Sequence, residues 1–307
     1  MTEAKAGAKT ILCAGGAVQD IVMRVERFPA PGAKIQASDA VIIIGGQAGN
    51  AAVALARLGA RVRYAGPIGA PGDAAASFVQ AALEREGIDC AGLVRVPGGT
   101  SSLSTIMVDR DGERTVTTRR GSNLNGVAPR DAGALVAGCD AVLLDNRYPD
   151  FALPVAIAAQ ARGLPRVLDF DRAAPADDPL LLASTHVIAS ADALAGATGE
   201  SDVAAGLQAM AKGFKGFLAV THGPAGVTWR DGDAVRHMDA FKVEAVDTLG
   251  AGDTFHGAFT LRLAETGDVV DSLRFASAGA ALKCTRFGGT SGAPTRDEVE
   301  EFLKARR

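Results

Sequence analysis

Short runs rich in β-branched residues alternate with stretches rich in Ala and Leu along most of the chain. The apolar runs are residues 10–14, 62–65, 141–145, 167–170, 186–189 and 217–221. The Ala- and Leu-rich stretches include residues 48–58, 74–86, 151–161 and 203–212. Glycines stand where these helices should end, at Gly59, Gly87, Gly163 and Gly213. The alternation predicts βαβ units, and therefore a parallel sheet covered by helices on both faces.

Two segments break this alternation. Residues 104–108 and 114–118 are strand-like and are joined by the turn sequence Asp109-Arg110-Asp111-Gly112, which predicts a β-hairpin. Residues 22–44 also favour strands, with no long helix between them. We expect residues of about 22–44 and 100–120 to form a small antiparallel sheet that covers the α/β body as a lid and excludes water from a site beneath it.

The length of 307 residues fits either two domains or one large α/β domain. The chain shows no low-complexity linker and no internal repeat. We therefore expect a single domain over residues 1–307, carrying the lid.

Composition and charge narrow the function classes. The chain has 32 Lys and Arg against 35 Asp and Glu, a net charge of −3, which excludes a generally basic nucleic-acid-binding protein. Its four cysteines are far apart in sequence and form no C-x-x-C pair, which indicates a reducing compartment. No apolar run is long enough for a membrane span or a signal peptide, so we expect a cytoplasmic protein with no membrane partner and a loose tail over residues 1–9.

Two common nucleotide-binding motifs are missing from the sequence. No Gly-Lys dipeptide occurs, which excludes a Walker-type P-loop. Residues 15–20, Gly-Gly-Ala-Val-Gln-Asp, lack the glycine spacing of a dinucleotide-binding Rossmann fingerprint.

The segment 246–259 carries the strongest chemical signal. Small residues precede an apolar helix there, so the backbone amides of Gly250, Ala251 and Gly252 can point at one anion with the support of the helix dipole. Asp253 falls in the first helical turn, where a carboxylate can accept the proton of an attacking hydroxyl. Composition alone equally allows a simple glycine turn in which Asp253 only caps the helix.

A second glycine cluster, Gly45-Gly46-Gln47-Ala48-Gly49-Asn50, precedes another predicted helix. Its small residues allow a polyol to approach the backbone, and the Asn50 amide can both donate and accept hydrogen bonds. Asp20 follows the first predicted strand and can accept two sugar hydroxyls. The alternatives are a glycine turn with a helix cap for Gly45 to Asn50, and an Asx-turn for Asp20.

Together, residues 15–20, 45–50 and 247–255 resemble the ribokinase/PfkB family of carbohydrate kinases, and the resemblance covers nearly the whole chain. It implies a ribokinase-like three-layer α/β/α sandwich with a mostly parallel central sheet and a small β-sheet lid. It also implies an ATP- and Mg²⁺-dependent kinase in which Asp253 is the base and the amides of residues 250–252 hold the phosphate. Asp20, Gly45, Gly46 and Asn50 would then bind the sugar.

The same resemblance implies a nucleotide side for two further segments. Residues 220–226 are similar to the family's nucleotide-binding turn, which makes Thr221, Gly223 and Gly226 candidates. Residues 281–289, with Cys284, resemble the wall of the adenine pocket.

Residues 247–255 match the family's signature, and we call them the signature segment. Within the family, details around this segment and the hairpin are similar to ketohexokinase and to bacterial sulfofructose kinases. We therefore expect an enzyme that phosphorylates a primary hydroxyl of a ketose or modified ketose. Arg114 and Arg147 match positions near the site in that branch, and their forked donors suit a phosphate or sulfonate. The alternative for each is a solvated surface charge.

The sequence departs from the family at two places. Where many members carry an Asn-x-x-Glu motif that organises Mg²⁺, this chain has Ser190 and Ala193, so no metal ligand is assigned. His256 replaces an Asn common after the signature, and its role is left open. A monovalent cation such as K⁺ is a further candidate cofactor, and family members often dimerise through the lid. The alternatives for function are a kinase for ribose, 2-keto-3-deoxygluconate or a nucleoside, and a catalytically silent sugar sensor.

Overall fold

The computed structural model describes residues 7–306; most of the tail expected over residues 1–9 lies outside them. The described chain forms a nine-stranded sheet in the order β13-β12-β11-β10-β9-β8-β1-β4-β5. Pairing is parallel from β11 to β5 and antiparallel only for β12 and β13. The bounds are β1 Thr10–Ala14, β4 Arg61–Ile68, β5 Asp89–Arg95, β8 Ala141–Asp145, β9 Arg166–Phe170, β10 His186–Ser190, β11 Phe217–Thr221, β12 Val227–Asp231 and β13 Ala234–Met238.

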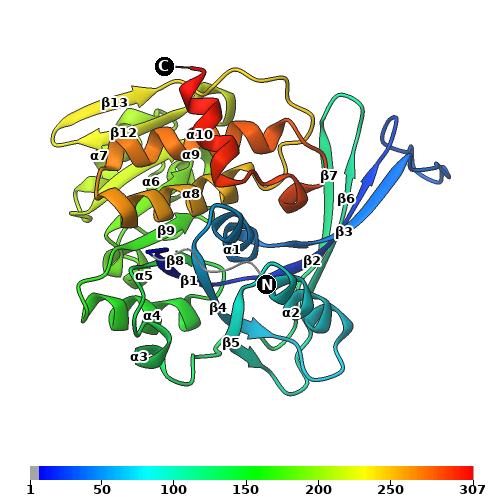
Figure 1. The fold of residues 1–307 in the computed structure, drawn as a ribbon, viewed down its shortest axis with the longest axis horizontal. Helices are drawn as coiled ribbons and strands as arrows, with labels where there is room; N and C mark the ends of the chain where they lie inside the picture. Colours follow the sequence, from blue (N-terminus) through cyan, green and yellow to red (C-terminus); the bar gives the residue numbers. More distant parts are fainter. Residues whose placement is uncertain (1–6, 307) are drawn as a thin grey trace.

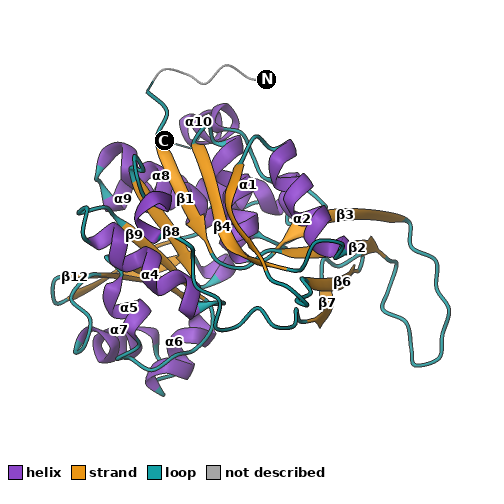
Figure 2. Ribbon diagram, turned by 90° about the horizontal axis from the view of Figure 1, so that it is seen from below, coloured by secondary structure: helices purple, strands orange, loops and turns teal. Residues whose placement is uncertain are grey.

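Helices cover both faces of this sheet (Figures 1 and 2). They are α1 Gln47–Arg57, α2 Ala74–Arg85, α3 Ala132–Leu135, α4 Pro149–Gln160, α5 Pro179–Ala183, α6 Ala191–Thr198, α7 Val203–Ala211, α8 Ala251–Thr266, α9 Val269–Cys284 and α10 Arg296–Lys304. The predicted three-layer α/β/α sandwich is confirmed. All four predicted glycines lie just after a helix; Gly59, Gly87 and Gly163 have a positive φ there, whereas Gly213 ends α7 without one and donates its amide to the Met210 carbonyl.

The two faces of the sheet have separate cores because neighbouring side chains of a strand point to opposite sides. On β1, Ile11 and Cys13 pack with α1, α2, α8, α9 and α10, while Leu12 and Ala14 pack with α4 to α7. All of β1 is buried, which accounts for the continuous apolar runs in the sequence.

A four-stranded sheet, which we call the lid sheet, stands beside this body (Figure 2). Its order is β3-β2-β6-β7, with bounds β2 Val18–Arg24, β3 Asp39–Gly45, β6 Ser102–Val108 and β7 Arg114–Arg119. The pairs β2–β3 and β6–β7 are antiparallel as predicted. The two pairs are joined through β2 and β6, which are parallel, so the sheet is not wholly antiparallel as expected. Strand β2 starts at Val18 rather than near residue 22. Val22, Ile106 and Val108 pack with Leu249 and Phe287 of the body.

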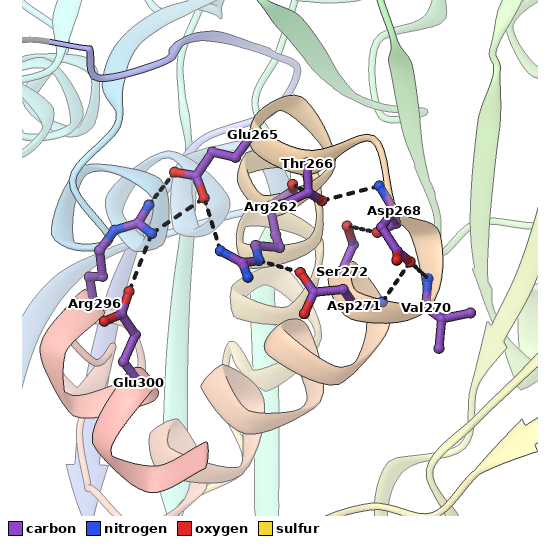
Figure 3. A network of polar contacts seen from close by, with 9 residues as sticks. All are labelled: Arg262, Glu265, Thr266, Asp268, Val270, Asp271, Ser272, Arg296 and Glu300. Atoms are coloured by element: carbon purple, nitrogen blue, oxygen red, sulfur yellow. Dashed lines mark hydrogen bonds and ion pairs between the residues drawn. The ribbon is translucent and has the colours of Figure 1, made fainter. Parts of the chain in front are cut away.

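The far end of α8 is held by a polar network with α9 and α10 (Figure 3). The Nε atom of Arg262 donates to Asp271 at 2.5 Å, and Arg296 forms ion pairs with Glu265 and Glu300. Asp268 caps α9 by accepting the amides of residues 270 and 271. The orientation of α8, which carries Asp253 at its other end, is therefore fixed by neighbours.

No helix among residues 7–306 is long and apolar enough to cross a membrane.

One side of α4 is buried in the core and the other is exposed, so substitutions on the two sides should differ in their effect on stability. Phe151 is 0% exposed, whereas Ile157 on the same helix is 54% exposed. We expect Phe151→Ala to lower the free energy of unfolding by about 3–5 kcal/mol, because it leaves a cavity in the core. Ile157→Ala, the matched control, should change it by less than about 1 kcal/mol. Guanidinium unfolding monitored by circular dichroism measures both, and equal losses would contradict this assignment of the core.

Candidate active site

Two helices far apart in sequence bring Asn50 and Asp253 together. Asn50 lies on α1 and Asp253 on α8, and the Nδ2 atom of Asn50 donates to the Oδ2 atom of Asp253 at 2.5 Å. The helices approach closely because residue 257 is glycine: a Cβ atom there would lie 2.8 Å from the carbonyl oxygen of Ala51. The two predicted glycine clusters therefore belong to one site.

The first turn of α8 presents backbone donors next to Asp253. Gly250 is its N-cap residue, in the left-handed region at φ 76°, and its carbonyl accepts from the amide and hydroxyl of Thr254. The Ala251 amide donates to the Thr248 carbonyl at 3.2 Å. Within residues 7–306 the amides of Gly250 and Gly252 have no acceptor. The anion site predicted from three amides thus has two free donors in this structure.

Asp253 is half-buried, and its carboxyl group lies in an anionic environment. Burial, and second the charge of Asp169, raise its pKa to about 7, although the hydrogen bond from Asn50 acts in the opposite direction. A carboxyl group with a pKa near neutrality is suited to proton transfer.

Asp20 lies on β2, paired with Ile43 and Ser104, and so occupies a strand rather than an Asx-turn. It is 5% exposed, and burial raises its pKa to about 6. Its carboxylate lies against the Gly45 backbone, since a Cβ atom at Gly45 would be 1.8 Å from Oδ2. Gly46, at φ 82°, likewise leaves no room for a side chain beside the Gly16 carbonyl.

Asp145, at the end of β8, is a residue that the sequence analysis missed as part of the site. Its buried carboxylate accepts the amides of Gly16 at 2.8 Å, Ala48 at 3.1 Å and Arg147 at 2.9 Å. It thereby fixes the turn before β2 to the start of α1. An acid as the last residue of an otherwise apolar, buried strand was the signal that could have found it.

The two predicted arginines lie on different elements. The Cγ atom of Arg147 is 3.0 Å from the position of a Cβ on Gly16, and its guanidinium lies over the Tyr148 ring. The Nη1 atom of Arg114 donates to Thr248 Oγ1 at 2.5 Å, so this lid residue reaches the signature segment. A hollow of about 430 Å³ lies beside Arg114, between residues 111–114 and 245–248.

His256 lies beneath the first turn of α8 and is 4% exposed. Its Nδ1 atom is 2.7 Å from the Gly252 carbonyl oxygen, and its Nε2 atom is 3.2 Å from that of Ile188 on β10. Burial lowers its pKa. The side chain therefore connects the helix to the central sheet, which answers the question left open by the sequence.

The residues predicted for the nucleotide side lie on the other half of the sheet and on α9. Thr221 ends β11, and Gly223 starts a short 3₁₀ turn, Gly223–Ala225. Gly226 is required by the fold itself, because a Cβ there would be 2.1 Å from the Met238 carbonyl oxygen. Cys284 is half-buried at the end of α9, and its carbonyl accepts the amides of residues 246 and 247.

The described residues offer no preformed metal centre: among residues 7–306 no three His, Cys, Asp or Glu side chains are arranged to hold an ion. Ser190, at one of the positions where many relatives carry a metal-organising motif, instead caps α6 by accepting the Ala193 amide. A Mg²⁺ ion would thus be held mainly by the phosphates that it accompanies.

Comparisons with known proteins find carbohydrate kinases that match nearly the whole chain. The family model described as pfkB family carbohydrate kinase matches residues 8–296. A ribokinase from Haemophilus influenzae is 31% identical over 96% of this chain and 99% of its own length. Among solved structures, a candidate ribokinase from Agrobacterium tumefaciens has a TM-score of 0.92 and 39% identity, covering 98% of this chain and 99% of that one. Arabidopsis thaliana ribokinase complexed with ribose and ATP has a TM-score of 0.83 and 26% identity, covering 97% and 99%.

The raised pKa of Asp253 predicts a stability effect. Its pKa in the fold, about 7, exceeds the ordinary value of 3.8, so the folded state holds the proton more tightly than the unfolded state. Stability is therefore lost as the pH rises from about 4 to about 7, and Asp253→Asn avoids this loss. We expect the variant to unfold roughly 2–5 °C higher than the wild type near pH 8, with a smaller difference near pH 5.

Differential scanning calorimetry at several pH values measures this shift. The exposed Asp177→Asn is the matched control and should show no such pattern. A difference between Asp253→Asn and the wild type that does not change with pH would contradict the prediction.

Proposed function

The chain belongs to the pfkB family of carbohydrate kinases, and from this premise we propose that it transfers the γ-phosphate of ATP to a primary hydroxyl of a ketose or modified ketose, of the fructose or sulfofructose type. The observation that carries the catalytic part is the placement of Asp253, with a pKa of about 7, beside the free amides at the start of α8. We treat residues 1–307 as one kinase domain with its lid.

In this proposal Asp253 accepts the proton of the sugar hydroxyl as its oxygen bonds to the γ-phosphorus. The bond from that phosphorus to the bridging oxygen breaks at the same centre, and ADP leaves with the electron pair. The amides of Gly250 and Gly252, with Ala251 in the same turn, stabilise the charge on the transferring group. Asn50 holds the Asp253 carboxylate through its 2.5 Å hydrogen bond. Mg²⁺, when bound with ATP, neutralises phosphate charge.

The sugar would lie among Asp20, Gly45, Gly46 and Asn50. The Oδ1 atom of Asn50 is buried and has no hydrogen-bond partner among residues 7–306, so it can accept from a ligand hydroxyl. Asp20, also buried, offers further acceptors, and a polyol supplies matching donors. The two glycines allow the sugar to approach the backbone.

A modified ketose is favoured by Arg147, whose side chain starts beside Gly16, close to the turn that leads to Asp20, and ends in a guanidinium over the Tyr148 ring. Such a group pairs well with a sulfonate or phosphate. Ribose is the second candidate acceptor, because the similar Arabidopsis protein is complexed with it. The nucleotide would lie toward Thr221, Gly223, Gly226 and Cys284.

We also propose that the protein forms a homodimer and works in the cytoplasm. Ile42 and Val116 expose 55% and 48% of their surface on strands at the two edges of the lid sheet, which supports a homodimer formed through this sheet. All four cysteines are free thiols in the structure, which fits the reducing cytoplasm.

Asp253→Asn is expected to lower kcat by about 10²- to 10⁴-fold, because it removes the general base. The KM for ATP should stay within about threefold of the wild type, since the amides are retained. In the wild type, kcat/KM for the sugar should fall as the pH drops through about 7, where the base of the free enzyme becomes protonated.

A coupled assay of ADP release measures both effects. Near-normal turnover of Asp253→Asn, with the fold verified by circular dichroism, would rule out this mechanism. Wild-type kcat/KM that is constant from pH 5 to 8 would leave Asp253 without its role as a base.

The acceptor is tested with fructose, 6-deoxy-6-sulfofructose, fructose 6-phosphate and ribose under the same assay. We expect a ketose to have the highest kcat/KM. Arg147→Ala should raise the KM of an anionic ketose by about tenfold or more and leave that of fructose within about threefold. The exposed Arg120→Ala serves as the control. A kcat/KM for ribose above those of all ketoses would replace the ketose assignment by ribose, and no turnover with any sugar would favour a sensor.

A further inference from the structure

Lys283, in the last turn of α9, has a fully buried side chain with 0% exposure. Lysine is rarely buried unless its charge is matched by nearby oxygens. Here the Nζ atom donates to the Asp247 carbonyl at 2.7 Å and to the Arg286 carbonyl at 3.3 Å, and lies 3.3 Å from Asp247 Oδ2. The ammonium group thus occupies the centre of three oxygens.

The Asp247 carboxylate connects this ammonium to the signature segment. Its Oδ1 atom accepts the Leu249 amide at 2.8 Å, and its Oδ2 atom accepts the amides of Gly288 and Gly289 at 2.9 and 3.0 Å. Asp247 is 1% exposed, so it cannot exchange these donors for water. One buried ion pair therefore joins α9, the turn after it and the segment that leads into α8.

The position of this segment sets the position of the anion site. Only Thr248 and Leu249 separate Asp247 from Gly250, whose amide is one of the two free donors. A donor acts on a transition state only when it is held in place beforehand. Removing the Lys283 charge would leave a buried carboxylate without its counter-ion, which strongly favours rearrangement of the segment.

Carbonyl and carboxylate oxygens of this kind also bind monovalent cations such as K⁺, by replacing the ion's hydration shell. The centre of the three oxygens is already filled by Nζ, and a second positive charge there would be repelled. The residues near Asp247 therefore do not fit the K⁺ ion considered from the sequence.

We propose that Lys283 is a positioning residue that acts as a tethered cation. Its ammonium holds Asp247 in place, and with it residues 248–252, which carry the proposed phosphate donors. The enzyme therefore works without a bound monovalent cation. This inference rests on the proposed role of residues 250–253 in phosphate transfer. It deepens that role by assigning the charge that organises the segment.

The wild type provides the first test and needs no substitution. Its kcat and unfolding temperature are measured with tetramethylammonium as the sole monovalent cation, and again in KCl at equal ionic strength. We expect kcat to change by less than about twofold and the unfolding temperature to stay the same. A rise in kcat of about tenfold or more in KCl, or a clear stabilisation by KCl, would overturn the proposal.

Lys283→Met provides the second test, with the exposed Lys215→Met as its matched control. Without small cations, Lys283→Met should lower kcat by roughly 100-fold and change the KM for ATP less, because the lost interaction acts in the transition state. K⁺ or NH₄⁺, which fit the emptied oxygen set, should restore kcat by about tenfold and raise the unfolding temperature. Lys215→Met should behave as the wild type.

The outcomes separate this inference from the proposed function. Full activity of Lys283→Met without small cations would exclude the positioning role, and a loss that neither K⁺ nor NH₄⁺ reverses would leave Lys283 with a packing role only. If Lys283→Met does not fold, the wild-type measurements decide alone. If the wild type phosphorylates no sugar, the proposed function fails, while the unfolding temperatures still test the tethered cation.

Discussion

The close approach of α1 and α8 is the constraint on which the whole site depends. A Cβ atom at Gly257 would be 2.8 Å from the Ala51 carbonyl oxygen, so the two backbones are in direct contact one turn after Asp253. Since Ala51 follows Asn50, this contact brings the Asn50 amide within 2.5 Å of the Asp253 carboxylate. The polar network at the other end of α8 prevents the helix from pivoting away (Figure 3).

Asp247 and Asp253 belong to the same segment, but their surroundings shift their pKa values in opposite directions. Burial acts to raise the pKa of both Asp247 and Asp253. For Asp247, the charge of Lys283 and three backbone amides outweigh burial, and the pKa falls below its ordinary value. Asp253 has the Asn50 side chain as its hydrogen-bond donor and anionic neighbours, so its pKa rises to about 7. A fully satisfied carboxylate shapes the fold, whereas a poorly satisfied one is available for a proton.

Local patterns in the sequence were sufficient to predict the βαβ body and the hairpins, because strand and helix periodicities are encoded residue by residue. They were also sufficient to mark Asn50 and Asp253, since glycine clusters before helices are visible in sequence. The parallel pairing of β2 with β6 was not predictable in this way, because it joins strands about eighty residues apart. The burial of Lys283 could not be predicted from local sequence either. A lysine near a helix end is typically a surface residue, and only the tertiary fold shows that this one is buried.

The segment before α8 is attached on two sides, and these attachments connect the proposed sugar site to the proposed phosphate site. On one side Asp247 is fixed to α9 through Lys283. On the other, Leu249 and Phe287 pack with the lid sheet, and Arg114 of the lid donates to Thr248 at 2.5 Å. Any movement of the lid sheet therefore acts on the two residues that precede Gly250. Asp20 and Gly45 lie on strands β2 and β3 of the same sheet and contact each other beside the proposed sugar site. Under the proposed function, contact of a sugar with the lid sheet is therefore transmitted to the backbone donors at the start of α8, and excluding water from the site strengthens both sets of interactions.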